Sequence, residues 1–319
     1  FKNTANLLLR YRYDDQYNSK EVVGDSSQHR VNFNLNSGPD FSPLTSSLQA
    51  DYRKTEFEPA PGRPDNNDSE LISAQINLGY QINRFWQING FFGQEWNDFV
   101  SRSDEIDGEF WGAGFTWTPN ARTTVEMGTG DRFFGNTPWV RISHRHKRSL
   151  FSLDYGKTLT YSRDIRAAGA VDDVDQPGHS TTQSNRPILD ERLTLAYSYN
   201  GRRSNFRVNA SYSDQTQERG SNPSDPTLNL NENTFKGISL SLNRTLSSNL
   251  SVFSRISWDH SEPKDDRILD VPSTETWKFN VGASRPLNSR TKLSLDYQYT
   301  DQHSDNDLNE YKENRITLR

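Results

Sequence analysis

Apolar and polar side chains alternate with a period of two residues along most of this chain. The segment 72–80 reads Ile-Ser-Ala-Gln-Ile-Asn-Leu-Gly-Tyr, and 293–299 reads Leu-Ser-Leu-Asp-Tyr-Gln-Tyr. Successive side chains of a β-strand point to opposite faces, so each segment predicts a strand with one apolar and one polar face. An amphipathic helix would space its apolar residues three and four apart. The alternation therefore predicts an all-β chain.

The segments that connect these strands are of two kinds, which themselves alternate. About sixteen strands can be counted, each roughly 10 residues long, which is the length a tilted strand needs to cross a bilayer. Short turns are expected at 81–84, 119–122, 146–149, 200–203, 246–249 and 287–290. Long polar stretches are expected at 55–70, 97–108, 162–187, 214–231 and 261–273. One end of the sheet is therefore predicted to be tight and the other bulky.

The composition decides between a soluble and a membrane protein. Only 31% of the residues are apolar and the mean hydropathy is −0.93, although 12% are aromatic. Soluble domains carry roughly 45–50% apolar residues, and disordered chains are poor in aromatics. Transmembrane β-barrels reconcile these values because only every second side chain faces lipid. The chain begins at Phe1 without a signal segment, as expected of a mature or trimmed exported protein.

The predicted fold is a transmembrane antiparallel up-and-down β-barrel that forms a single domain over 1–319. About 16 strands (16–18) are expected, with short periplasmic turns and long extracellular loops in the outer membrane of a Gram-negative bacterium. The alternation is weakest at 47–53, at 123–132 and in the last strand. Closure is expected because an open edge leaves backbone groups unpaired in lipid. The alternative, a soluble β-sandwich or β-solenoid, would have shorter strands.

A barrel of this size leaves an aqueous channel, so the polar face is expected to line a lumen. The candidate lumen residues are Arg10, Arg12, Arg30, Asp51, Arg53, Glu126, Arg132, Arg141, Arg145, Asp154, Arg207, Arg255, Asp259, Lys278 and Asp296. This set leans basic although the chain carries a net charge of −5, and a basic wall would concentrate anions. The surplus acid lies in the loops, at Asp104, Glu105, Asp107, Asp172, Asp173 and Asp175. An equally open interpretation is that lumen charges pair across strands merely to be satisfied.

Aromatic residues are expected to form girdles at the two membrane interfaces. The candidates are Trp86, Trp111, Trp117, Tyr155, Tyr197, Tyr199, Tyr212, Trp258, Trp277, Tyr297 and Tyr299. Such rings could also stack on sugars, but only where they point inward, and the alternation directs most of them outward.

Motifs for catalysis or cofactor binding are not found. The sequence holds no phosphate-cradling glycine loop, no His-Glu-x-x-His and no Gly-x-Ser-x-Gly, so no enzyme activity, cofactor or metal is predicted. His144 and His146 share a strand face without an evident third ligand. The acidic run 172–175 could hold Ca²⁺ loosely, but a solvated loop is the better interpretation. The mild acidity gives no reason to expect nucleic acid.

Two neighbouring stretches carry a family resemblance. Residues 111–123 read Trp-Gly-Ala-Gly-Phe-Thr-Trp-Thr-Pro-Asn-Ala-Arg-Thr, and 130–137 read Gly-Asp-Arg-Phe-Phe-Gly-Asn-Thr. They resemble the outer-membrane β-barrel family associated with PEP-CTERM/exosortase exopolysaccharide gene clusters, where a W-x-P-x-x-R-T turn precedes R-F-F-G. The resemblance implies a role near polysaccharide export. Members of that family usually carry further chain before the point where this sequence begins, which would allow 18 strands. Residues 132–135 are expected to end a strand and lead into an outer or inward loop, where Gly135 relaxes the backbone.

The favoured function is an outer-membrane channel that acts as a passive conduit for exopolysaccharide export. A general diffusion porin and a scaffold barrel that holds or anchors a partner protein remain open. An outer-membrane enzyme would need a positioned nucleophile and base, or facing carboxylates, which the sequence does not single out. The expected partners are outer-membrane lipid and lipopolysaccharide, together with polysaccharide cargo and periplasmic export components.

Overall fold

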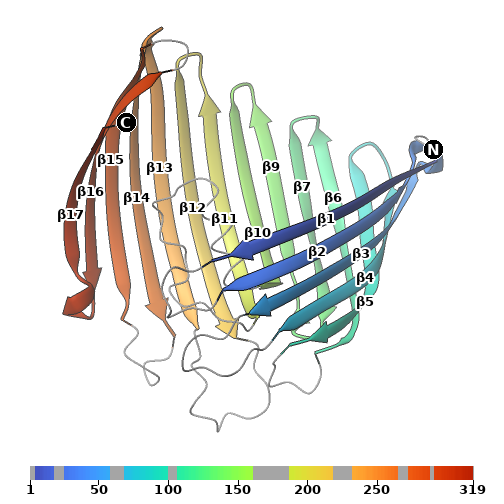
Figure 1. The fold of residues 1–319 in the computed structure, drawn as a ribbon. Helices are drawn as coiled ribbons and strands as arrows, with labels where there is room; N and C mark the ends of the chain where they lie inside the picture. The colour runs from blue at the N-terminus through green and yellow to red at the C-terminus, as the bar shows by residue number, and fades with distance from the viewer. Residues whose placement is uncertain are drawn as a thin grey trace.

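The chain folds into a single antiparallel sheet of seventeen strands (Figure 1). The computed structural model describes residues 4–17, 25–57, 68–99, 106–160, 187–217, 232–264, 272–287 and 291–318. The strands are β1 (Ala5–Gln16), β2 (Ser26–Ser37), β3 (Leu44–Phe57), β4 (Ser69–Gln81), β5 (Trp86–Asp98), β6 (Gly108–Asn120), β7 (Thr123–Arg132), β8 (Gly135–Asn136), β9 (Trp139–His146), β10 (Ser149–Thr160), β11 (Ile188–Asn200), β12 (Ser204–Gln217), β13 (Asn233–Ser247), β14 (Leu250–Pro263), β15 (Thr274–Pro286), β16 (Lys292–Ser304) and β17 (Tyr311–Leu318). Two short 3-10 turns, η1 (Pro39–Phe41) and η2 (Asp307–Asn309), complete the elements. Among the described residues, no helix is long and apolar enough to span a membrane.

The connectivity is up-and-down. Each strand pairs antiparallel with the next along the chain, except that β9 pairs with β7 beyond the two-residue β8. The predicted all-β antiparallel order is confirmed, and sixteen long strands match the predicted number. The three strands with the weakest alternation are all present, as β3, β7 and β17.

The sheet curls strongly, so that β1 to β5 cross in front of the later strands in Figure 1. The two edge strands lie apart in that view, with β1 ending near the middle and β17 at the left. Within the described strands, β1 pairs only with β2 and β17 only with β16. The curled sheet therefore keeps two edges that are not joined to each other.

The register aligns the alternation of every strand and gives the sheet one apolar and one polar face. Ile76, for example, pairs with Leu48 on one side and with Phe92 on the other. Apolar side chains on this face are widely exposed: Leu9 at 67%, Phe92 at 56% and Ile316 at 74%. Buried side chains are mainly polar, including Gln28, Thr55, Ser69, Glu95, Asp190, Gln215, Ser257, Thr276 and Thr300. This distribution is the reverse of that in a soluble protein.

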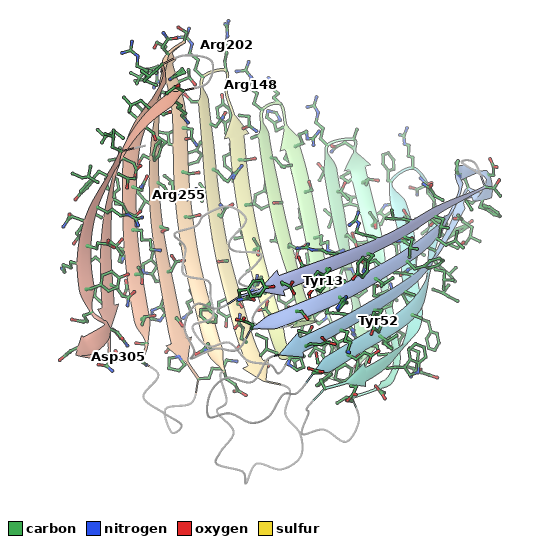
Figure 2. All side chains as sticks on the ribbon, in the orientation of Figure 1. Tyr13, Tyr52, Arg148, Arg202, Arg255 and Asp305 are labelled. Atoms are coloured by element: carbon green, nitrogen blue, oxygen red, sulfur yellow. The ribbon has the colours of Figure 1, made fainter. Side chains whose placement is uncertain are left out.

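The two ends of the sheet differ as predicted. Tight connections at 82–85, 121–122, 147–148, 201–203 and 248–249 join strands at one end, here called the turn end, where Arg148 and Arg202 lie (Figure 2). At the opposite or loop end, where Asp305 lies, are the ends of the strands that flank the predicted long stretches (Figure 2). Most of those stretches fall outside the described residues.

One connection at the loop end departs from the prediction. Residues 132–135 do not lead into a loop but form a tight turn, because β7 and β8 pair through Arg132 and Gly135. Gly135 has a φ of 95°, in the left-handed region that glycine adopts without steric cost. The need for a positive φ at Gly135 follows from the geometry of the turn, and the alternation of apolar and polar residues does not predict it.

Candidate functional site

The polar face of the sheet is its concave face and holds the candidate site. The register places all fifteen predicted lumen residues on this face. It also places there seven charged residues that the prediction omitted: Asp14, Glu95, Asp190, Glu313, Arg192, Lys292 and Arg315. The alternation could have predicted these seven residues. Each lies an even number of positions from another polar residue of its strand, and such side chains point to the same face. Basic side chains still outnumber acidic ones on this face.

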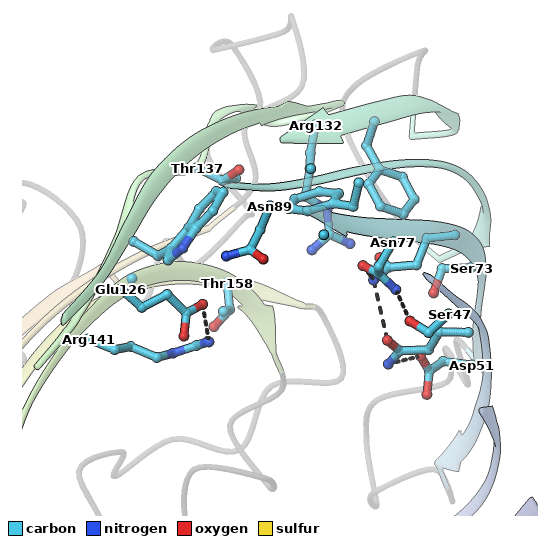
Figure 3. A pocket seen from close by; sticks show the side chains of 18 of the residues that line it. Ser47, Asp51, Ser73, Asn77, Asn89, Glu126, Arg132, Thr137, Arg141 and Thr158 are labelled. Atoms are coloured by element: carbon cyan, nitrogen blue, oxygen red, sulfur yellow. Dashed lines mark hydrogen bonds and ion pairs between the residues drawn. The ribbon is translucent and has the colours of Figure 1, made fainter. Parts of the chain in front are cut away.

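A cavity of about 1200 Å³ opens on the concave face (Figure 3). Its lining comes from β2 to β7 on one side and from β9 to β11 on the other. Its charged members are four basic and four acidic residues: Arg132, Arg141, Lys157 and Arg192, with Asp51, Glu126, Asp154 and Asp190. The cavity is therefore close to neutral, unlike the basic-leaning face as a whole.

An amide-rich wall bounds the cavity along β3, β4 and β5. Gln75 donates to the Oε1 of Gln49 at 3.3 Å and to the Oδ1 of Asn77 at 2.8 Å. Asn77 donates in turn to the Oγ of Ser47 at 3.0 Å. Gln49 donates to a carboxylate oxygen of Asp51 at 3.1 Å (Figure 3). These bonds hold the side chains in place, and all five residues line the cavity.

The opposite wall is ionic. Arg141 on β9 lies between two carboxylates, with its Nη1 3.3 Å from the Oε1 of Glu126 and its Nε 3.2 Å from the Oδ2 of Asp154. On β11, Arg192 pairs with Asp190 at 2.8 Å. The predicted lumen charges Arg141, Glu126 and Asp154 therefore pair across strands, whereas Arg192 and Asp190, which were not predicted, pair within one strand.

Between the two walls lies an aromatic floor, made of Phe91 on β5, Phe110 on β6 and Trp139 at the start of β9. The Phe91 ring centroid is 5.7 Å from that of Trp139 and 6.1 Å from that of Phe110. All three occupy polar-face positions and line the cavity. None of the three was predicted to line the lumen, because each is an apolar residue at a position where the alternation of its strand calls for a polar one.

Glycines beneath the aromatic floor explain why the rings lie on the sheet. A Cβ at Gly112 would overlap the Phe91 ring, and one at Gly128 would overlap the Trp139 ring. A Cβ at Gly114 would approach Trp139 to 2.9 Å. Only glycine allows side chains from neighbouring strands to rest directly on the backbone here. The glycines on the polar side of 112–114 and 128–130 were the sequence signal for this floor.

Three arginines form a row on the polar face of the first strands. Arg30 pairs in register with Arg12 on one side and with Arg53 on the other. Like charges opposite each other across strands normally destabilise a sheet. Arg12 is bridged to Asp14 at 2.7 Å, and Arg30 donates to Gln28. The row nevertheless concentrates positive charge on the concave face.

The eleven predicted girdle aromatics all lie on the apolar face by register. Trp86, Trp117, Tyr197 and Tyr199 are near the turn end, whereas Trp111, Tyr212, Trp258, Trp277 and Tyr299 are in the loop half. Tyr155 and Tyr297 are close to the strand centres, and Tyr155 also borders the cavity. Trp86 stacks on Trp117 with centroids 5.6 Å apart.

The remaining candidates add no metal centre. His144 lies on the apolar face, where its Nδ1 is 2.8 Å from the Oγ1 of Thr123. No group of three or more His, Asp or Glu within the described ranges is placed to hold a metal ion. Asp104, Glu105, Asp172, Asp173 and Asp175 lie outside the described residues.

Comparison with known proteins gives structural likeness only. No family model and no curated protein matches the sequence. A BenF-like porin from Pseudomonas fluorescens Pf-5 is similar over 99% of this chain and 97% of its own, with 9% identity and a TM-score of 0.42. Pseudomonas aeruginosa OpdO (98% and 95% covered, 12% identity, TM-score 0.41) and OmpTdeltaL8 of Vibrio cholerae (99% and 97%, 10%, 0.38) are similar to comparable extents.

Proposed function

We propose that this protein is an outer-membrane channel that conducts polar solutes, in particular polysaccharide. One observation carries the proposal: sixteen long strands present an exposed apolar face outward and bury polar side chains on the concave side. Such a surface is stable only where hydrocarbon covers the apolar face, and water or polar solute fills the interior. The two sets of aromatics on the apolar face match the interfaces of a bilayer.

The electrostatics of the polar face favour anionic solutes. Basic side chains outnumber acidic ones there, and the row of Arg12, Arg30 and Arg53 adds a strong local field. Exposed basic residues also stand at the turn end: Arg84, Arg122, Lys147, Arg148, Arg202 and Arg203. An anionic polymer that approaches the turn end would therefore be attracted to the opening and then along the wall.

The cavity supports a saccharide cargo over a purely ionic one. Its lining is nearly neutral and rich in amides and hydroxyls, the groups that hydrogen bond sugar hydroxyls. The resemblance of 111–137 to the exopolysaccharide-associated family is consistent with this cargo. Outer-membrane lipid and lipopolysaccharide would contact the apolar face, and periplasmic export components would meet the turn end.

A scaffold role is the second candidate, and it is favoured by the two edge strands, each of which pairs with one strand only among the described residues. Edge strands that are not joined to each other, β1 and β17, offer backbone groups to which a partner strand could pair. A general diffusion porin would use the same wall without selecting saccharide.

The test is single-channel recording of the purified protein in planar bilayers. We expect discrete conductance steps and, in a salt gradient, a reversal potential that shows anion preference. Arg30→Glu should lower that preference, whereas Lys236→Glu, the same charge change on the apolar face beside Tyr212, should leave it unchanged. A protein that inserts without conducting would overturn the channel. An anion preference that is unchanged in Arg30→Glu would overturn the electrostatic part of the proposal.

A further inference from the structure

We propose that the aromatic floor and the amide-rich wall together form a binding site for a neutral stretch of saccharide chain. The site comprises Phe91, Phe110 and Trp139 with Gln49, Gln75, Asn77 and Asn89. This inference rests on the proposed channel function and adds a specific contact surface to it.

The aromatic floor exposes apolar ring surface on a face of the sheet that is otherwise polar. Phe110 is 4% exposed and packs against Phe91, while Phe91 and Trp139 are half-buried and line the cavity. Their planes are inclined by 38° to each other and their centroids are 5.7 Å apart, so the two rings form one apolar platform in the cavity lining. The C–H face of a pyranose ring is apolar and of similar size. Covering the platform with that face removes apolar surface of both partners from water.

Glycine placement shows that the floor is built into the sheet. Gly112, Gly114 and Gly128 lie beneath Phe91 and Trp139, and each would crowd a ring if it carried a Cβ. Three glycines weaken the pairing of β6 and β7 because they supply no side chain to pack. An aromatic cluster of purely structural use would more naturally lie on the apolar face, where lipid covers it.

Polar groups beside the floor supply the complementary half of saccharide recognition. Asn89 donates to the Oγ1 of Thr116 at 2.8 Å, two residues along β5 from Phe91. Asn77, Gln75 and Gln49 continue the series away from the floor, and each is held by a neighbour. Fixed amides next to a ring surface bind a molecule that is apolar on its faces and hydroxylated at its rim.

The nearby charges argue for a neutral rather than a strongly anionic residue at this position. Arg141 is already shared by Glu126 and Asp154, and Arg132 by Glu95. A carboxylate or phosphate bound by either arginine would have to displace one of these partners. Arg192 is likewise paired with Asp190, and the fourth cation of the lining, Lys157, lies over the Phe134 ring. A polymer that carries charge elsewhere can still present its neutral units to the floor.

The test measures equilibrium binding in detergent, which requires no conduction. Isothermal titration calorimetry with maltohexaose, cellohexaose and isomaltohexaose should detect binding of at least one hexasaccharide. Trp139→Ala and Phe91→Ala should each weaken it at least tenfold, and Trp139→Phe should weaken it less. Phe253→Ala is the matched control, because Phe253 also rests on a glycine of the concave face, Gly282, but lies outside the cavity lining. Heat-modifiable migration in gels should show that every variant is folded.

The outcomes separate this inference from the channel itself. If no hexasaccharide binds while bilayer conductance is intact, the saccharide site is overturned and the channel stands. If binding is present and depends on Trp139 while conductance is absent, the site stands and the channel is overturned. Equal losses in Trp139→Ala and Phe253→Ala would also overturn the site, since the effect would then be general to concave-face aromatics.

Discussion

Arg132 on β7 reaches past β6 to place its Nε 2.5 Å from the Oε1 of Glu95 on β5. Glu95 is only 2% exposed, and the Arg132 guanidinium also lies over the rings of Phe110 and Phe134, 5.4 and 5.2 Å from their centroids. This contact links two strands that do not pair with each other, and it holds the Arg132 side chain that lines the cavity.

Glu95→Ala should destabilise the protein because it leaves the Arg132 charge partly buried without its partner. The expected loss is about 1–3 kcal/mol of unfolding free energy, measured by urea titration in detergent with tryptophan fluorescence. Glu126→Ala, at a far more exposed position beside Arg141, should cost less than about 1 kcal/mol. Similar losses of unfolding free energy in the two variants would show that the burial of Glu95 does not strengthen its pair with Arg132.

Glu275 should couple energetically to the girdle tryptophans. Its Oε1 accepts hydrogen bonds from the Nε1 of Trp258 at 2.8 Å and of Trp277 at 3.0 Å. In a double-mutant cycle, Glu275→Ala and Trp277→Phe should be non-additive by about 1 kcal/mol, because Phe retains a ring but has no N–H to donate. Strict additivity of the two unfolding free energies would contradict the contact.

Gly135→Ala should destabilise the hairpin of β7 and β8 through the backbone alone. No atom lies near the position an added Cβ would occupy, but the φ of 95° is unfavourable for alanine by roughly 1–2 kcal/mol. Gly108→Ala is the matched control, since its surroundings are equally open and its φ is not in that region. The difference between the two thermal midpoints in detergent measures the strain, and equal midpoints would refute it.

Gly128→Ala should displace Trp139 from the aromatic floor. The added methyl group would overlap the indole, and overpacking of this kind costs typically about 1–3 kcal/mol. Gly156→Ala, whose nearest neighbour is the Pro138 carbonyl at 4.0 Å, should be almost neutral. Unfolding midpoints test the stability difference. Hexasaccharide affinity should fall with Gly128→Ala and be retained with Gly156→Ala.

The alternation of single strands predicts most of what is local in this protein. It gives β7 with its observed bounds of 123–132, and it assigns every predicted lumen charge to the polar face. The strand bounds and the face of each side chain are predictable because a period of two can be recognised in a few consecutive residues. No information about distant strands is needed.

Features that depend on how strands align were not predictable in the same way. The Glu95–Arg132 pair needs the register of β5, β6 and β7 together. The aromatic floor needs Phe91 to meet Gly112, and Trp139 to meet Gly128, across neighbouring strands. The tight turn at Gly135 depends on a backbone angle that sequence periodicity does not report.

The unjoined edges of the sheet bear on the size of the bore. Neither β1 nor β17 contributes a residue to the lining of the cavity, which begins at β2 and ends at β11. A further hairpin between the edge strands β1 and β17 would therefore widen the channel. The aromatic floor and the amide-rich wall would keep their positions relative to each other. In this architecture the width of the channel and the binding of a saccharide can therefore change independently.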